Sequence, residues 1–95
     1  MKNRGTLSAD TVPHFTPGAR LQYDKVRAAW IIQAPERYFE LDAVATEIVK
    51  RIDGATSVEV IVGDLAALYN APKNRIFSDV SAMLQDLLDK GVLAA

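Results

Sequence analysis

The chain has 95 residues, of which 49% are hydrophobic and 24% charged, and its formal net charge of −1 together with this composition indicates one small domain. It has no cysteine, which excludes disulfides, thiolate metal sites and cysteine nucleophiles, and its single histidine, His14, lies between prolines in a stretch without periodicity, which argues against a histidine-based triad or metal site. These features favour a binding module that needs no cofactor and no metal over an enzyme.

Residues 1–18 contain two prolines, two glycines and no periodic pattern, so we expect a flexible N-terminal arm. The domain would then occupy residues 19–95. No stretch approaches the ~20 apolar residues of a membrane span, and the N-terminus lacks the apolar segment of ~7–15 residues that a signal peptide needs. We therefore expect a cytoplasmic protein with no membrane partner.

Three short strands are predicted between residues 19 and 41. Residues 21–23 (LQY) alternate apolar and polar side chains, as a half-buried strand does. Residues 28–32 (AAWII) are apolar on both faces, which is typical of a central strand. Residues 38–41 (YFEL) form the third strand after the break at Pro35. The short turns predict an antiparallel meander whose first and third strands are its edges.

After this sheet the apolar period changes from two to about 3.6, which predicts helices. Asp42 is a suitable N-cap for the first helix, and Gly54 can adopt the left-handed conformation that follows its end. Ser57 is a suitable N-cap for the second helix. Gly63 within that helix costs on the order of 1 kcal/mol relative to alanine, and close packing against another helix would account for it.

The third helix has the clearest pattern. Pro72 suits its first turn, and apolar residues recur at helical spacing through residues 76–88. Gly91 can end the helix in a Schellman motif that places Val92 against Leu87. The predicted fold is therefore α+β and winged-helix-like, with a three-stranded antiparallel sheet followed by a three-helix bundle.

A winged-helix arrangement often binds DNA, so a DNA-binding regulator is the alternative function. The first 52 residues carry a net charge of +2 and the remainder a net charge of −3, whereas affinity for nucleic acid depends largely on positive charge. The third helix offers cationic and amide side chains only at residues 73–75. Asp79, Asp86 and Asp89 follow and would repel the phosphate backbone.

The edge strand at residues 38–41 has two interpretations. Arg37 and Glu40 can simply protect an exposed edge from pairing with other chains. Alternatively, an extended peptide adds to this edge as a fourth strand, held by main-chain hydrogen bonds and by side chains that enter a groove against the third helix. Composition favours neither.

A series of short motifs runs through residues 19–93 and leaves out the N-terminal arm. They are LQYDKVR at 21–27, Trp30, APER at 34–37, Leu41-Asp42, Ile48, Asp53-Gly54, LYNAP at 68–72, Asp79-Val80 and LQDL at 84–87. In this order and spacing they resemble the pyrroloquinoline quinone biosynthesis protein D (PqqD) family.

The resemblance implies a domain without catalytic activity of its own that binds the leader of a ribosomally made precursor peptide. In the family this peptide is the Glu- and Tyr-containing precursor of pyrroloquinoline quinone (PQQ), and the domain presents it to a radical S-adenosylmethionine enzyme that cross-links the two side chains. The resemblance therefore implies a peptide chaperone in PQQ biosynthesis with no nucleic-acid partner. It would be a monomer or a homodimer, with or without exchanged segments.

In related domains the leader lies along the third strand, beside the third helix. Carried over to this chain, the backbone of residues 38–41 would pair with the leader, two arginines would meet acidic leader residues, and Asp79 would meet a basic one. Val80→Asp would then abolish peptide binding and leave the fold intact. The expected site consists of Arg37, Tyr38, Phe39, Glu40, Leu41, Arg75, Ile76, Asp79, Val80 and Met83.

Overall fold

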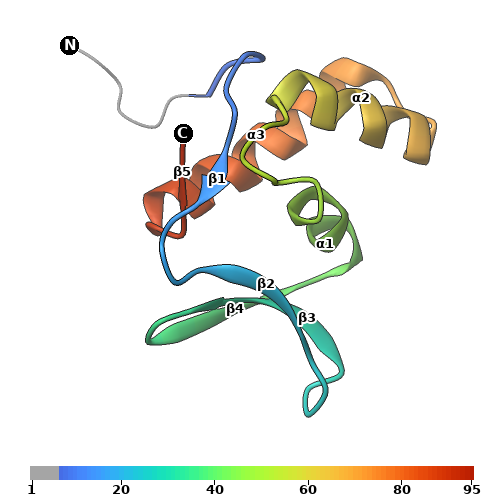
Figure 1. The fold of residues 1–95 in the computed structure, drawn as a ribbon. Coiled ribbons are helices and arrows are strands. Elements are labelled where there is room, and N and C mark those ends of the chain that lie inside the picture. Colours follow the sequence, from blue (N-terminus) through green and yellow to red (C-terminus); the bar gives the residue numbers. More distant parts are fainter. Residues whose placement is uncertain (1–6) are drawn as a thin grey trace.

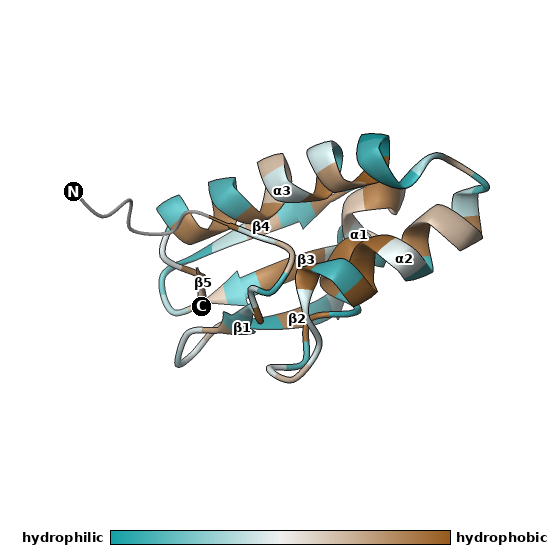
Figure 2. Ribbon diagram, turned by 90° about the horizontal axis from the view of Figure 1, so that it is seen from above, coloured by the Kyte–Doolittle hydropathy of each residue, from teal (hydrophilic) through white to brown (hydrophobic). Residues whose placement is uncertain are grey.

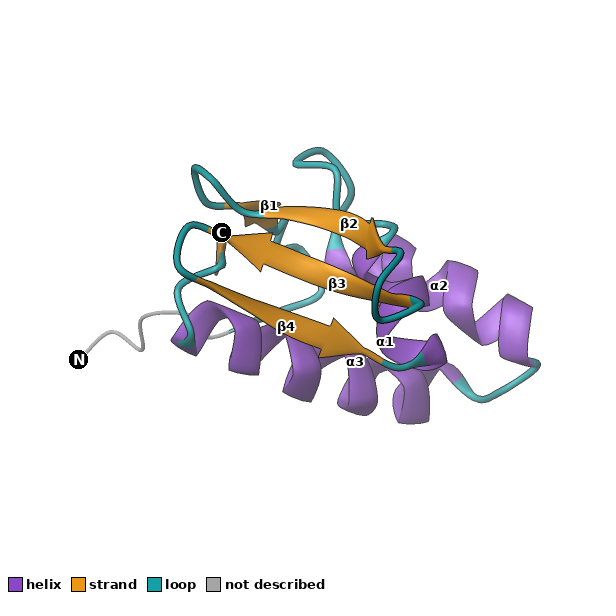
Figure 3. Cartoon of the chain, turned by 90° about the horizontal axis from the view of Figure 1, so that it is seen from below, coloured by secondary structure: helices purple, strands orange, loops and turns teal. Residues whose placement is uncertain are grey.

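A three-stranded antiparallel sheet forms one layer of the molecule (Figures 1 and 3). The computed structural model describes residues 7–95. The strands are β2 (Arg20–Asp24), β3 (Ala29–Ala34) and β4 (Arg37–Leu41), in the spatial order β2-β3-β4. The central strand β3 pairs with β2 over residues 29–33 and with β4 over residues 30–34. The predicted meander, with its first and third strands as edges, is confirmed.

Three helices cover one face of this sheet (Figure 1). They are α1 (Ala43–Val49), α2 (Val58–Tyr69) and α3 (Lys73–Asp89). Within residues 7–95, the other face of the sheet carries no helix, as Figure 3 shows. The predicted α+β fold, a three-stranded sheet followed by three helices, is confirmed.

The predicted N-caps of the first two helices are also confirmed. Asp42 Oδ1 accepts a hydrogen bond of 2.8 Å from the Ala45 amide, and Ser57 Oγ accepts one of 3.3 Å from the Val60 amide. These side chains satisfy amide groups that have no partner within the helix. Pro72 differs from the prediction: it is the N-cap residue of α3, with an extended backbone (ψ 139°), and does not lie in the first turn.

Gly91 ends α3 as predicted. It has φ +81°, its amide donates to the Leu88 carbonyl at 3.0 Å, and the Val92 amide donates to the Leu87 carbonyl at 3.2 Å, which is the Schellman pattern. The prediction that Gly63 packs closely against another helix is wrong, because a Cβ added there would meet no atom of another element within 4 Å.

The hydrophobic core lies between the sheet and the helices, where the apolar segments of both layers face each other (Figure 2). The central strand contributes Ile32, which is fully buried, and α3 contributes Val80 and Leu84. The core consists of Ile32, Ala34, Ile48, Val49, Ile52, Val58, Ile61, Val62, Leu65, Val80, Leu84, Leu87, Val92 and Leu93.

The two ends of the described chain pair with each other. β1 (His14–Phe15) and β5 (Leu93–Ala94) form a separate two-stranded antiparallel sheet. Thr16 adds a hydrogen bond of 2.9 Å from its hydroxyl to the Gly91 carbonyl. The stretch around His14 is therefore not irregular, contrary to the sequence-based expectation.

The segment before β1 contacts the start of α2. The Val58 amide donates to the Thr11 carbonyl at 2.8 Å, and the Glu59 amide donates to the Ala9 carbonyl at 2.9 Å. These carbonyls serve two of the amides that a helix leaves free at its start. Residues 7–18 are thus bound to the domain along much of their length, whereas residues 1–6 of the predicted arm lie outside the described residues.

Candidate binding site

The strand β4 is an edge of the sheet and leaves one side of its backbone without a strand partner within the described chain. Tyr38 and Glu40 are exposed on the face of the sheet away from the helices, whereas Phe39 and Leu41 are half-buried against the core. This alternation follows from the two-residue period of a strand. A free edge with one apolar and one polar face can accept a further extended chain.

Arg37 fixes the beginning of β4 to the end of α3. Its guanidinium donates a hydrogen bond to the carbonyl of Lys90, the residue that follows α3. The same guanidinium lies 5.1 Å from the centre of the Phe39 ring, within range of a cation–π contact. Since α3 ends beside the start of β4, the first half of α3 lies toward the other end of the strand.

The turn between β2 and β3 contacts the outer face of β4. The Arg27 guanidinium lies 4.2 Å from the centre of the Tyr38 ring and forms a 2.7 Å ion pair with Asp24. The hydrogen bond from the Arg27 side chain lowers the pKa of Asp24 below its ordinary value, and the amides of Arg27 and Val26 act in the same direction. Asp24 therefore holds both the turn and the cation that covers Tyr38.

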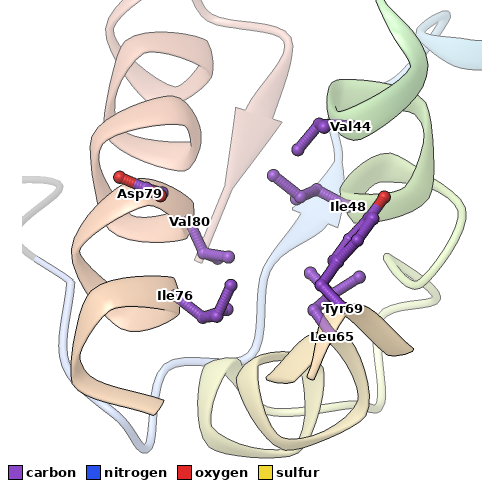
Figure 4. Close-up of a pocket in the computed structure, with 7 residues that line it drawn as sticks. All are labelled: Val44, Ile48, Leu65, Tyr69, Ile76, Asp79 and Val80. Carbon is purple, nitrogen blue, oxygen red and sulfur yellow. The ribbon is translucent and has the colours of Figure 1, made fainter. Parts of the chain in front are cut away.

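A pocket of about 170 Å³ opens between the helices, beside the first half of α3 (Figure 4). Figure 4 shows side chains from α1 and α2 on one side of it and side chains from α3 on the other. The two residues at its mouth, Val44 and Tyr69, are 51% and 41% exposed. The pocket is lined by Val44, Ile48, Leu65, Tyr69, Ile76, Asp79 and Val80.

Asp79 is the one charged residue in this lining. Among residues 7–95, no cationic group lies within 4.0 Å of its carboxylate. The Asp79 side chain is exposed, so it can accept hydrogen bonds from a bound molecule. The pocket thus combines apolar walls with one free acceptor.

The predicted site residues are placed at different points along β4 and α3. Ile76, Asp79 and Val80 come together in the pocket. Arg75 is exposed in the first turn of α3 and does not line the pocket, and Met83 is half-buried against the core further along the helix.

Val80 is 1% exposed and belongs to the core. The expectation that Val80→Asp preserves the fold is therefore wrong, because the substitution would place a carboxylate in the apolar interior. A substitution that tests the pocket has to be made at its mouth, where the side chains reach solvent.

Four residues that line the pocket were not predicted from the sequence. Val44 and Ile48 belong to the apolar stripe of α1, and Leu65 belongs to that of α2. Tyr69 stands in the motif that joins α2 and α3. Val44 is 51% exposed, which shows that the core does not cover part of the apolar stripe of α1.

Residues 7–95 hold no group of three or more His, Asp or Glu side chains that could bind a metal ion. None of the helices in the described chain is long and apolar enough to cross a bilayer. What the site offers is an unpaired strand edge with an apolar pocket near its end, the arrangement by which domains hold an extended peptide. Fold and site together define a winged-helix-like peptide-binding domain.

Comparison with known proteins gives the family. Residues 29–93 match the family model described as Coenzyme PQQ synthesis protein D (PqqD), and the chain belongs to the PqqD family. A relative from Rhodopseudomonas palustris (strain ATCC BAA-98 / CGA009), named PqqA binding protein, is 51% identical over 90 residues, which are 95% of this chain and 88% of the relative. A relative of the same name from Gluconobacter oxydans (strain 621H) is 45% identical over 87 residues, covering 92% and 91% of the two chains.

Two solved structures are similar. The solution structure of the PqqD part of Methylobacterium extorquens PqqCD, described as a functional and stand-alone recognition element for ribosomally synthesized and post-translationally modified peptides, has a TM-score of 0.81 and 37% identity, over 96% of this chain and 98% of that one. The crystal structure of PqqD from Xanthomonas campestris has a TM-score of 0.55 and 39% identity, over 90% and 94%. At almost the same identity, the arrangement of this chain is closer to the first.

Proposed function

We propose that this chain binds PqqA, the precursor peptide of PQQ, as an extra strand on the edge of β4. The observation that carries the proposal is the edge of β4, which has no strand partner within residues 7–95. The helix that follows β4 in the chain and the first half of α3 line a pocket. The names of the relatives, PqqA binding protein, support the identity of the peptide. The solved recognition element from M. extorquens supports a role in which the domain acts by binding.

In this mode of binding, the backbone and the side chains of the peptide make different contributions. Main-chain hydrogen bonds along β4 would supply affinity, each contributing about 0.5–1.5 kcal/mol net. Side chains of alternate peptide residues would reach the apolar side of the strand and supply specificity. Near-zero net charge suits a partner held in this way. Phe39 and Leu41, half-buried against the core, form the strand's side of this contact.

In this proposal the domain carries out no chemistry itself. It holds the leader of PqqA and presents the rest of the peptide to a radical S-adenosylmethionine enzyme, which cross-links the Glu and Tyr side chains. Because the peptide is made on ribosomes, the complex would form in the cytoplasm. Arg37 and Arg75 remain candidates for acidic leader residues, although the structure engages Arg37 with the Lys90 carbonyl.

The acidic outer surface of α3 favours a peptide over DNA. Asp79, Asp86 and Asp89 are all exposed, whereas the cations Lys73 and Arg75 occur only in the first turn. A recognition helix in the major groove needs cationic or amide side chains facing the bases and phosphates. A row of carboxylates opposes that contact.

The test is a titration of fluorescently labelled PqqA with the full chain, followed by anisotropy, with and without the radical enzyme. The proposal predicts saturable binding by the chain alone, no binding of a scrambled peptide, and a ternary complex when the enzyme is added. A chain that binds the enzyme but not PqqA would be an adaptor and would contradict the proposal. Duplex DNA binding that weakens steeply with salt, in place of PqqA binding, would identify a regulator.

A further inference from the structure

The pocket lies beyond the carboxyl end of β4. Arg37, the first residue of the strand, is bonded to Lys90 at the end of α3, so the strand and the helix run in opposite directions. The pocket residues of α3 come from its first half, and Val44 stands in α1, which begins two residues after β4 ends. A peptide on the edge of β4 would therefore reach the pocket as it passes Leu41.

The volume of the pocket, about 170 Å³, corresponds to a single side chain. Sites for cofactors and drug-sized molecules usually enclose ~300–1,000 Å³. A cavity of ~150 Å³ with walls of leucine, isoleucine and phenylalanine holds benzene. One branched aliphatic or aromatic side chain thus fits the space between Ile48, Leu65 and Ile76.

The exposed residues of the pocket lining are partly apolar and partly acidic. Val44 and Tyr69 leave apolar surface in water, which a ligand would cover with a gain from the hydrophobic effect. Asp79 has no cationic partner among the described residues. A basic group beside the inserted side chain would complement this carboxylate.

The direction of the peptide follows from the sheet. All neighbouring strands are antiparallel, and a fourth strand that continues this pattern runs opposite to β4. Its N-terminal end then lies near Leu41 and the pocket, and its C-terminal end lies near Arg37.

We propose that the pocket anchors one bulky apolar side chain of the precursor peptide, next to a basic residue that meets Asp79, on the N-terminal side of the segment that pairs with β4. This inference rests on the proposed function. It adds the site that selects the peptide and the direction in which the peptide runs along β4. The residues that select the peptide are then Val44, Tyr69, Ile76 and Asp79.

Two matched variants of the full chain test the anchor. Val44→Trp fills the mouth of the pocket, and Val60→Trp makes the same change on α2 outside the pocket lining, at a residue that is also 51% exposed. Calorimetry with PqqA should show binding about ten- to hundredfold weaker for Val44→Trp, the loss expected from excluding one buried side chain. Val60→Trp should bind within twofold of the wild type. Equal affinities for both folded variants would overturn the anchor.

The peptide itself tests the same contact from the other side. Each bulky apolar residue of PqqA is replaced by alanine in turn. At one position the alanine peptide should bind the wild-type chain more weakly than PqqA does, but should bind Val44→Trp with the same affinity as PqqA does. Asp79→Asn should weaken binding about three- to tenfold at low salt, and the difference should shrink as salt is added. Additive losses, or an Asp79→Asn variant that binds like the wild type at low salt, would contradict the proposed contacts.

A nitroxide at the N-terminus of PqqA tests the direction. It should broaden the methyl signals of Val44 and Ile76 more than the amide signals of Lys90 and Gly91. The reverse pattern would overturn the direction. If PqqA does not bind the wild type at all, the proposed function fails; if PqqA binds and perturbs β4 while Val44→Trp binds normally, only the pocket inference fails.

Discussion

Gly63→Ala is expected to stabilise this domain. Gly63 lies in the interior of α2, is half-buried, and has ordinary helical geometry rather than a positive φ. A Cβ added there would meet no atom within 4 Å apart from its chain neighbours and the backbone of its own helix, so the substitution introduces neither a clash nor strain. Alanine loses less backbone entropy than glycine when the helix forms.

The magnitude follows from helix propensity. Glycine in a helix interior is about 0.8–1.0 kcal/mol less favourable than alanine, so the free energy of unfolding should rise by about 0.5–1 kcal/mol. For a domain of this size this corresponds to a rise in Tm of about 3–6 °C. Gly91→Ala is the matched control: its φ of +81° is left-handed, and alanine there should cost about 1–2 kcal/mol.

Thermal and urea unfolding followed by circular dichroism measure both variants, and anisotropy with labelled PqqA should show unchanged affinity for Gly63→Ala. An unfolding free energy for Gly63→Ala at or below the wild-type value would refute the reasoning. It would mean that α2 packs against something at Gly63 that the described chain does not contain.

Two further predictions concern stability. Leu93 is 2% exposed in β5, so Leu93→Ala should lower the free energy of unfolding, measured in urea, by about 2–4 kcal/mol. Deletion of the exposed Ala95 is the control and should leave this free energy unchanged. An unchanged free energy for Leu93→Ala would show that β5 contributes little to stability. Hydrogen bonds from Ala55 and Thr56 lower the pKa of Asp53 below its ordinary value of 3.8, so its contribution is present above that pH and lost as the pH falls through the folded-state pKa. Asp53→Asn should therefore be less stable than the wild type at about pH 7, with a difference that shrinks at about pH 2–3; a difference that is constant with pH would contradict this assignment.

The sequence predicted those parts of the fold that depend on neighbouring residues. Asp42 and Ser57 cap their helices because each side chain bonds to an amide three residues on. Gly91 ends α3 because its φ is positive, a conformation that glycine adopts easily. These predictions are confirmed because each depends only on residues a few positions apart in the sequence and on no distant contact.

Contacts between distant residues could not be predicted in this way. β1 and β5 have two residues each and pair across nearly the whole chain, too short to show a period-two pattern. The carbonyl of Thr11 that serves the start of α2 carries no side-chain signal at all. Segments without a periodic pattern can therefore be fixed by backbone hydrogen bonds to distant residues.

The candidate site was predicted only in part, for a related reason. Helical periodicity identifies the apolar stripe of α1, which contains Val44 and Ile48, but not how far its neighbours cover it. The pocket exists where α3 does not close over that stripe. Ile76 and Val80, two of the predicted site residues, line the pocket, but the depth of Val80 in the core depends on the packing of all three helices.

The most direct test of peptide addition at β4 is hydrogen exchange of ¹⁵N-labelled protein, measured by NMR with and without saturating PqqA. Within the part of the chain that the structure describes, one side of the β4 backbone has no strand partner. PqqA should therefore slow exchange of amides within residues 37–41 and shift the signals of Ile76 and Asp79. The amides of β2, at the opposite edge, should exchange at unchanged rates. Slowed exchange confined to β2, or saturated binding with β4 unaffected, would contradict the account.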